Sequence, residues 1–345
     1  MQSSDRVLLG WQATTQEVEA VAEALPDVDV VAVPPHPSLS PYDCAPEAFE
    51  EMAKDADSVL AWGINNRVLG RLTNLKLLAW LHSGIDPIDQ SVLEANGIAL
   101  TNVSGANADA VAEHAFALAL SLAKRLPERN ARVRDSVWVP LWQPGTSAML
   151  LHGATIVVVG IGAIGSRVAR IAKAFGMQVL GVRRSGEADE AVDEMFRTDG
   201  LISALRRADL VVVAVPLTDA TNGLIGHHEL EAMPSHSYLV NVCRGHVVDE
   251  AAVRAALDTE SIAGFASDVW WTYPNHIPEG WHFAVPSRLG VHRHANTVAT
   301  GDHASDVIAV RDTMIATGIE NVRAFLAGET PPNLLFDGRV WHRRP

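Results

Sequence analysis

The chain has 345 residues, which is long enough for two domains of ordinary size. It is 48% hydrophobic and 20% charged, as globular proteins are, and it lacks the apolar run of about 18 residues that a membrane helix needs. The formal net charge of −14 is unlike the basic character of nucleic-acid-binding proteins. These features argue against a membrane partner and against a nucleic-acid partner.

The two cysteines, Cys44 and Cys243, lie far apart in the sequence, without the spacing of a metal site. A disulfide scaffold is therefore excluded, and a reducing compartment fits best. The polar segment Met1–Arg6 lacks the apolar core of a secretion signal. We therefore expect a cytoplasmic protein.

The first hundred residues alternate short apolar strands with helical stretches. This alternation predicts a parallel sheet covered on both faces. The expected strands are Val7–Gly10, Val28–Val33, Ser58–Trp62, Leu77–Leu81 and Ile98–Asn102, with a helix at Thr15–Leu25 after the first of them.

A long alanine-rich helix is expected at Asn107–Leu126, followed by a connector rich in Trp and Pro. A second alternation follows, and the helix Ile308–Leu326 is expected to return to the first domain. The fold class is therefore α/β with two doubly wound parallel-sheet domains. We place the first domain at residues 1–103 plus 299–345 and the second at 104–298. The strands expected in the second are Thr155–Val159, Gln178–Val182, Leu210–Val215, Tyr238–Val242 and Ala263–Val269.

A glycine-rich turn joins the strand ending at Val159 to the helix that follows it. Gly160 permits the tight turn, Gly162 lets the backbone approach a pyrophosphate, and Gly165 lets the helix pack closely on the strand. The N-terminus of that helix offers N–H groups and a positive dipole end to phosphates. Between a strand and a helix, this spacing indicates dinucleotide binding of the Rossmann type.

The next strand ends at Val182, and Arg183, Arg184 and Ser185 follow it. A site for NAD(H) places an acidic residue here to bind the ribose hydroxyls. An arginine instead favours the 2′-phosphate of NADP(H) through charge-assisted hydrogen bonds. We expect NADP(H) to be preferred, with NAD(H) as the alternative cofactor.

Two side chains are candidates for the chemistry. Arg244 ends a buried strand, where a charge is costly unless it serves an anion. His292 follows a loop rich in Pro and Trp, and histidine is the natural proton donor near neutral pH. We expect the guanidinium and the imidazole to converge on the reactive face of a nicotinamide.

These residues belong to a series of motifs that resembles the D-isomer-specific 2-hydroxyacid dehydrogenase family, which includes glyoxylate/hydroxypyruvate reductases, phosphoglycerate dehydrogenases and formate dehydrogenases. The motifs occur in the family order over about Leu77 to Leu326, whereas the first 75 residues match only in pattern. Besides the glycine turn they are Ser83-Gly84-Ile85-Asp86, Asn107-Ala-Asp-Ala-Val111-Ala-Glu113, Val215-Pro216-Leu217-Thr218, Asn241-Val-Cys-Arg244-Gly245-His-Val-Val-Asp249-Glu250, Asp268-Val269-Trp270 and His292.

The resemblance implies a flavodoxin-like substrate domain, a Rossmann dinucleotide-binding domain and a small 2-keto or 2-hydroxy acid as substrate. Arg244 would hold the substrate carboxylate together with the backbone N–H groups of Ser83 and Gly84. His292 would donate the proton. The cofactor residues implied are Val111, Gly160, Gly162, Ala163, Ile164, Gly165, Arg183, Arg184, Ser185, Val215, Pro216, Thr221, Val242, Cys243, Arg244, Asp268 and His292.

The sequence departs from the family at Tyr273, where a glutamate (glutamine in formate dehydrogenases) normally orients the histidine. A phenol carries no negative charge at neutral pH, so the pKa of His292 should be lower and reduction weaker or acid-shifted, unless Glu279 or another carboxylate fills in. Arg293 and His294 replace small or apolar residues, and we expect His294 to bind a further substrate charge.

Other polar and aromatic groups have more than one interpretation. Asp109, Glu113 and His114 share the long helix, but we expect them to flank a dimer interface and expect no metal. Four tryptophans either pack loops or shape an aromatic substrate pocket. They are Trp142, Trp270, Trp271 and Trp281.

Three functions remain open at this stage. The first is NAD(P)-dependent reduction of a 2-keto acid, or oxidation of a D-2-hydroxy acid, by a homodimer. The second is oxidation of a small anion, as in formate dehydrogenases, against which Tyr273 and Arg183 argue. The third is a dinucleotide-sensing binding protein on the same fold, like the C-terminal-binding-protein co-repressors, because fold alone does not establish activity.

Overall fold

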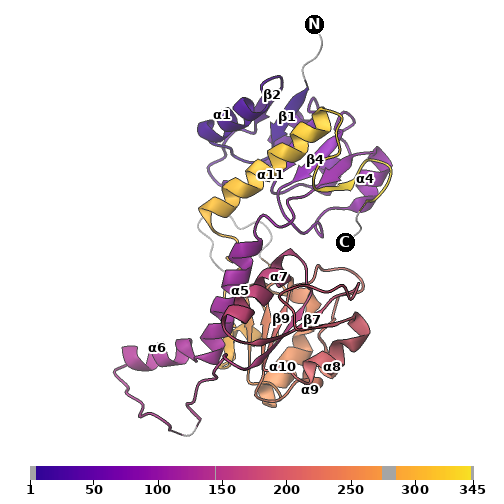
Figure 1. Cartoon of the computed structure of the whole chain (residues 1–345). Helices are drawn as coiled ribbons and strands as arrows, with labels where there is room; N and C mark the ends of the chain where they lie inside the picture. The colour runs from indigo at the N-terminus through magenta and orange to yellow at the C-terminus, as the bar shows by residue number, and fades with distance from the viewer. Residues whose placement is uncertain (1–4, 144, 274–284, 343–345) are drawn as a thin grey trace. The chain divides into compact units, whose positions relative to one another are not determined.

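The computed structural model describes residues 5–143, 145–273 and 285–342 (Figure 1). The chain divides into two compact units. Within the described residues, the first unit comprises 5–107 and 308–342, and the second comprises 108–273 and 285–307. The second unit thus extends to Val307 rather than to residue 298, because the strand Thr297–Ala299 pairs with Gly264–Ser267 of the second sheet.

The first unit holds a six-stranded sheet in the order β13-β5-β4-β3-β1-β2. Its strands are β1 Arg6–Leu9, β2 Asp29–Ala32, β3 Ser58–Ala61, β4 Leu77–Trp80, β5 Ala99–Thr101 and β13 Leu334–Phe336. The sheet is parallel except at its edge, where β13 runs antiparallel to β5, a strand that the sequence pattern did not predict. Its helices are α1 Thr15–Ala24, α2 Pro46–Ala53, α3 Asn66–Leu69, α4 Gln90–Asn96 and α11 Ile308–Leu326.

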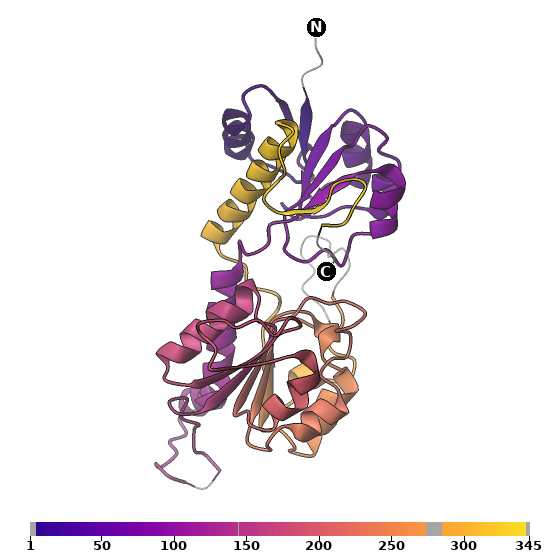
Figure 2. The ribbon, with the colours of Figure 1, turned by 45° about the vertical axis from the view of Figure 1, so that its right-hand side comes forward.

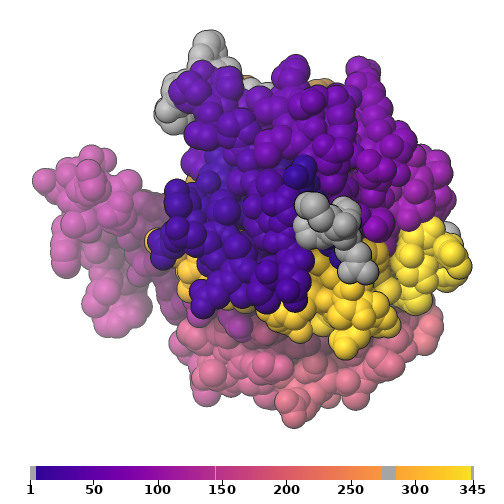
Figure 3. Space-filling view, turned by 90° about the horizontal axis from the view of Figure 1, so that it is seen from above, coloured from indigo at the N-terminus to yellow at the C-terminus, as the bar shows by residue number. Residues whose placement is uncertain are grey.

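Alternation along the strands builds a core on each face of this sheet. Val7 and Leu9 face α1 and α11, whereas Leu8 faces the core formed with α2, α3 and α4. Thr14 and Glu17 form a capping box at the start of α1. An Arg311–Glu17 ion pair then ties α11 to α1, so the C-terminal part of this unit lies against its N-terminal part (Figure 3).

The second unit holds a seven-stranded, fully parallel sheet in the order β12-β11-β10-β9-β6-β7-β8. Its strands are β6 Thr155–Val159, β7 Gln178–Val182, β8 Glu194–Phe196, β9 Leu210–Val213, β10 Tyr238–Asn241, β11 Gly264–Ser267 and β12 Thr297–Ala299. Its helices are α5 Ala108–Ala123, α6 Leu126–Arg134, α7 Ala163–Ala174, α8 Leu201–Leu205, α9 His227–Ala232 and α10 Glu250–Asp258, with single 3₁₀ turns at Thr198–Gly200, Gly245–Val247 and Val291–Arg293.

Helices cover both faces of this second sheet (Figure 2). Ile156 and Val158 of β6 pack in the core formed with α5 and α7. Val157 and Val159 point to the opposite face and pack in the core formed with α8, α9 and α10. A strand buried on both faces reads as a continuous apolar run, which is what the sequence shows here. The architecture is the predicted one, with two parallel-sheet α/β units.

The prediction of one helix over Asn107–Leu126 is wrong at its C-terminal end. α5 stops at Ala123, and Arg125 adopts φ 53° before α6 begins. The Arg125 side chain bonds the Glu128 carboxylate and the Gly145 carbonyl, and this holds the left-handed turn. α6 and the segment after it project from the rest of the second unit in both ribbon views (Figures 1 and 2).

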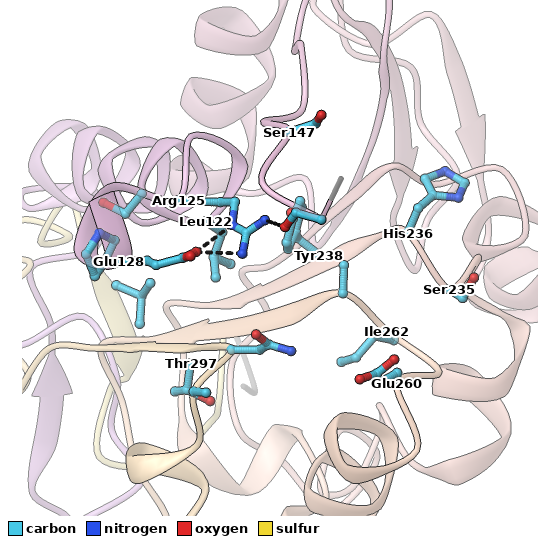
Figure 4. A pocket seen from close by; sticks show the side chains of 17 residues that line it. Leu122, Arg125, Glu128, Ser147, Ser235, His236, Tyr238, Glu260, Ile262 and Thr297 are labelled. Atoms are coloured by element: carbon cyan, nitrogen blue, oxygen red, sulfur yellow. Dashed lines mark hydrogen bonds and ion pairs between the residues drawn. The ribbon is translucent and has the colours of Figure 1, made fainter. Parts of the chain in front are cut away.

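A cavity of about 620 Å³ lies at the amino ends of β10, β11 and β12 (Figure 4). Arg125, Glu128, Tyr238 and Thr297 are among its lining residues. Because the sheet is parallel, this cavity is at the edge opposite to the glycine turn that follows β6. It is therefore separate from the predicted dinucleotide site. Within the described residues, no helix combines the length and apolarity that spanning a bilayer requires.

Candidate active site

Most of the predicted site residues of the second unit gather at one edge of its sheet. All seven strands are parallel, so the segments that follow them emerge at the same edge, where α/β proteins bind ligands. Segments 160–165, 183–185 and 215–218 follow β6, β7 and β9. Segments 242–244, 268–273 and 300–304 follow β10, β11 and β12. The last segment was not singled out by the sequence motifs.

The glycine turn has the geometry of a phosphate cradle. Gly160 has φ +101°, and a Cβ there would lie 2.6 Å from the Ala214 carbonyl oxygen. A Cβ at Gly165 would overlap the Gly160 carbonyl group. At Gly162, the N-cap of α7, a Cβ would meet nothing within 4 Å. Two glycines are thus needed for packing and the third faces open space, so this turn fits a dinucleotide pyrophosphate.

Guanidinium groups surround the end of β7. Arg183 Nη2 lies 3.3 Å from the Glu187 carboxylate, and Arg197 Nη1 donates to the Ser185 carbonyl oxygen at 3.2 Å. Arg184 and Ser185 are exposed. An anion arriving here would meet two neighbouring arginines and a hydroxyl, which is the donor set that a ribose 2′-phosphate requires.

Buried Asn241 shapes the turn that carries Arg244. Its side-chain amide donates to the Arg244 carbonyl oxygen at 3.0 Å, and its Oδ1 accepts from the Cys243 N–H at 3.1 Å. The Arg244 guanidinium donates to the Cys243 carbonyl oxygen at 2.8 Å. Burial raises the pKa of the Cys243 thiol to about 11, so this cysteine is not a thiolate nucleophile.

Asp268, which is 1% exposed, organises the segment that follows β12. Its carboxylate accepts from Thr300 Oγ1 at 2.7 Å and from the N–H groups of His303 at 3.1 Å and Ala304 at 2.9 Å. His114 Nε2 lies 2.9 Å from Thr300 Oγ1 and 3.4 Å from the carboxylate. The main role of Asp268 in this structure is therefore to anchor residues 300–304. The sequence motifs did not predict this role.

Tyr273 and Asp302 both lie within electrostatic range of Arg244. The Tyr273 hydroxyl accepts from the Trp270 N–H at 3.1 Å and its side chain remains 39% exposed. Burial and the nearby Asp302 carboxylate raise the pKa of Tyr273 to about 12, against the opposing charge of Arg244. Burial and the charge of Asp268 also raise the pKa of Asp302, again opposed by Arg244. The site therefore joins a guanidinium, a phenol and a carboxyl group.

His292 has different neighbours. Its ring centre lies 6.1 Å from that of Trp270, and its buried Nδ1 has no hydrogen-bond partner in the described part of the chain. Burial and the charge of Arg293 lower its pKa, and Glu250 opposes them. The direction of the shift is the one expected from the sequence. Glu279, named as a replacement, lies outside the described residues.

His294 lies still further from the other candidates. Its Nε2 is 3.8 Å from Asp258, the last residue of α10, and its Nδ1 accepts from the Asn296 N–H at 3.2 Å. These contacts place it before β12, towards the amino ends of the strands. The structure does not bring His294 together with Arg244, because Arg244 follows the carboxyl end of β10, whereas His294 precedes the amino end of β12, with β11 between the two strands.

The remaining cofactor candidates have ordinary structural surroundings. Val111 is buried in α5. Thr221 Oγ1 donates to the Pro216 carbonyl oxygen at 2.6 Å and accepts from the Thr218 N–H at 2.8 Å, which closes the loop after Val215. Val242 is buried beside the Arg244 turn, and Ala163 and Ile164 form the first turn of α7. No group of three or more His, Cys, Asp or Glu suited to a metal occurs within the described ranges.

In the first unit, Ser83 and Gly84 follow β4. Gly84 accepts a 2.8 Å hydrogen bond from Trp80 Nε1, and Ser83 Oγ donates to Asn107 Oδ1 at 3.2 Å. An aromatic group that sequence reasoning missed lies at the same edge of this sheet. Trp62 makes edge-to-face contacts with Trp11, Tyr42 and His82, at centroid distances of 6.4, 5.7 and 5.4 Å. The sequence did carry a signal for this group, because Trp11 and Trp62 each lie within two residues of the end of a predicted strand.

The tryptophans named from the sequence have other roles. Trp270 and Trp271 donate 2.7 Å hydrogen bonds to the carbonyl oxygens of Thr300 and Val248, so both support the loops after the strands. Trp142 is 89% exposed on the segment after α6. Trp281 lies outside the described residues.

The chain is similar to known oxidoreductases. A family model described as "D-isomer specific 2-hydroxyacid dehydrogenase, NAD binding domain" matches residues 116–296. A glyoxylate reductase of Korarchaeum cryptofilum is 34% identical over 305 residues, which cover 86% of this chain and 87% of that protein.

Two solved structures share the fold. An NADPH-dependent glyoxylate/hydroxypyruvate reductase of Sinorhizobium meliloti, in complex with NADP and malonate, is 24% identical with a TM-score of 0.76 and covers 99% of this chain and 100% of its own. An acyclic imino acid reductase in complex with NADPH and D-Arg is 23% identical with a TM-score of 0.79, covering 96% and 100%.

Proposed function

Because the chain belongs to the D-isomer-specific 2-hydroxyacid dehydrogenase family and is an NAD(P)-dependent oxidoreductase, we propose that it reduces a small 2-keto acid to the D-2-hydroxy acid with NADPH. The observation that carries this proposal is the placement of the Arg244 turn at the same sheet edge as the glycine turn. A dinucleotide bound at the glycine turn and a substrate carboxylate bound by Arg244 would therefore both lie at the carboxyl edge of the second sheet.

The residues of this chain bind and orient the reactants. Arg244 binds the substrate carboxylate, and its turn is fixed by Asn241 before any ligand arrives. We propose that the N–H groups of Ser83 and Gly84 share that carboxylate. When bound, the nicotinamide supplies a hydride to the carbonyl carbon. Tyr273 and Asp302 are titratable groups within electrostatic range of Arg244, and His292 remains the candidate from the sequence for delivering the proton.

Preference for NADPH is part of the proposal. Arg183, Arg184 and Ser185 stand where an acidic residue would select NADH, and Arg197 adds a third guanidinium to the same loop. The same donor set favours the charged 2′-phosphate over the ribose hydroxyls of NADH, because guanidinium groups bond an ionised acceptor more strongly and cannot accept the hydroxyl protons.

We further propose a homodimer formed through α5, α6 and the segment after them. Trp138, Leu141 and Trp142 are 85%, 79% and 89% exposed on that segment. Exposed aromatic side chains on one projecting segment are typical of an interface. The Trp138→Ser/Trp142→Ser double variant should sediment as a monomer, whereas Val340→Ser, which alters an exposed apolar residue of the first unit, should not change the mass.

The direct test is NADPH and NADH consumption with glyoxylate, hydroxypyruvate and phenylpyruvate. We expect turnover with at least one acid, faster with NADPH, and a loss of about 100-fold or more in kcat/KM for Arg244→Ala. Arg207→Ala, which removes an exposed arginine paired with Glu194, is the matched control. Tight NADPH binding without turnover of any acid would instead favour the dinucleotide-sensing protein.

Both free cysteines are compatible with a cytoplasmic location.

A further inference from the structure

The backbone of Asp302 is held by hydrogen bonds at the carboxyl end of β12, the edge strand of the second sheet. Its N–H donates a 2.7 Å hydrogen bond to the Asp268 carbonyl oxygen, and its neighbours Thr300, His303 and Ala304 all bond the Asp268 carboxylate. Its φ is 61°, in the left-handed region that costs a non-glycine residue energy. The segment is therefore fixed on both sides of Asp302, while Asp302 itself remains accessible to solvent.

The charge of this group matters for the reacting bond. During carbonyl reduction the oxygen becomes negative, and an ionised carboxylate beside it opposes that change. A protonated imine carries its positive charge on nitrogen, and a carboxylate beside it keeps that nitrogen protonated. The protonated imine is also the form that accepts hydride readily. An anion beside Arg244 thus suits a substrate with a carboxylate at one end and a cationic nitrogen next to it.

We propose that Asp302 gives this site a second activity, the reduction of protonated imines that form from 2-keto acids and ammonia or a primary amine. The proposal rests on the proposed function, since Arg244 holds the same substrate carboxylate in both reactions. The Tyr273 hydroxyl accepts from the Trp270 N–H, can donate its own proton, and lies within electrostatic range of both Arg244 and Asp302. Burial and the Asp268 carboxylate raise the pKa of Asp302, and the charge of Arg244 opposes them.

The reaction balances as follows. The 2-keto acid loses water on condensation with the amine, and the imine nitrogen is protonated. A hydride from NADPH forms the new C–H bond, the C=N π electrons pass to nitrogen, and NADP⁺ is released. The neutral amine then takes one proton from solvent and leaves as an ammonium ion. Asp302 contributes charge stabilisation and is neither consumed nor covalently changed.

The test compares NADPH consumption by 2-keto acids in ammonium or methylammonium chloride with that in sodium chloride of equal ionic strength, at mildly alkaline pH. We expect the rate to rise by about tenfold or more with either amine, and mass spectrometry to find the corresponding amino acid. Asp302→Asn should lower the ratio of amine-dependent to amine-independent rate by about tenfold or more. Asp306→Asn, which removes an exposed carboxylate on the same segment, should leave the ratio unchanged.

Each outcome is decisive. Equal rates in ammonium and sodium salts, with 2-keto acids still reduced, would overturn the imine activity and leave the proposed function standing. No turnover of any acid with either cofactor, with or without amine, would overturn the proposed function itself. An amine-dependent rate whose ratio is unchanged in Asp302→Asn would overturn the assignment of that activity to Asp302.

Discussion

The backbone N–H of Asp302 donates a 2.7 Å hydrogen bond to the main-chain carbonyl oxygen of Asp268. The Asp268 side chain meanwhile accepts from three further donors on the same segment. Two loops that follow neighbouring strands are thus locked together. The position of the exposed Asp302 carboxyl group is therefore set by a carboxylate that is itself buried.

Asp268→Asn should destabilise the second unit without changing its shape. The amide supplies one acceptor instead of two charged oxygens, and its NH₂ group faces backbone N–H groups. The loss of charge-assisted, buried hydrogen bonds should cost about 2–3 kcal/mol. Urea denaturation measures this. Asp258→Asn, at the exposed end of α10, is the control and should keep its midpoint. Equal midpoints for the two variants would contradict the anchoring role of Asp268.

Two glycines of the dinucleotide turn should respond differently to the same change. Gly165→Ala places a Cβ on the Gly160 carbonyl, so the protein should unfold at a clearly lower temperature. Gly162→Ala has open space around it, so thermal stability should stay near that of the wild type while the dissociation constant for NADPH rises by about tenfold or more. Calorimetric titration and thermal unfolding separate the two effects. Tight binding by Gly162→Ala would show that the cofactor does not approach this turn.

Arg183→Ala should change cofactor selection more than catalysis. Losing a charge-assisted contact to the 2′-phosphate should raise KM for NADPH by about tenfold, with little change for NADH or in kcat. Its ion pair with Glu187 is exposed, so stability should not fall. Initial rates with each cofactor test this, with Arg207→Ala as the control. An equal loss with both cofactors would indicate a general role in binding.

The sequence predicted most of the second unit because its signals are local. β6 is a continuous apolar run followed directly by three spaced glycines, and the structure places both where expected. Tyr273 was identified by its distance from Asp268 along the chain, and its hydroxyl accepts from the Trp270 N–H in the same segment. Such features depend on neighbouring residues, so a pattern of spacing is enough to find them.

Asp302 could not be found in this way. β12 has only three residues, is partly exposed and carries little of the apolar pattern of a core strand. The conformation of residues 300–304 is fixed by Asp268, which is far away in sequence. His292 was favoured because of its chemical type, but its 3₁₀ turn precedes β12 and gives it Trp270, Arg293 and Glu250 as neighbours. Spacing along one chain does not reveal contacts of this kind.

The pH dependence of stability provides a test of the Asp302 environment. Burial and Asp268 raise the pKa of Asp302 in the folded protein above its unfolded value. The folded state therefore binds its proton more tightly, and stability falls as the pH rises from the unfolded pKa through the folded one. Asp302→Asn removes the titrating carboxyl group and with it this loss of stability at higher pH. The variant should melt at a higher temperature than the wild type at neutral pH, and the difference should shrink in mildly acidic buffer.

Asp193 offers a control of opposite sign in the same unit. Its carboxylate accepts from Lys173 and from the Val179 N–H, and these bonds lower its pKa. Its stabilising effect is present above the unfolded pKa and is lost as the pH falls through the folded value. Asp193→Asn should therefore melt lower than the wild type at neutral pH and converge with it in acid. If Asp302→Asn instead behaves like Asp193→Asn, the Asp302 carboxylate is stabilised by its surroundings, and a cationic substrate would not be needed to balance it.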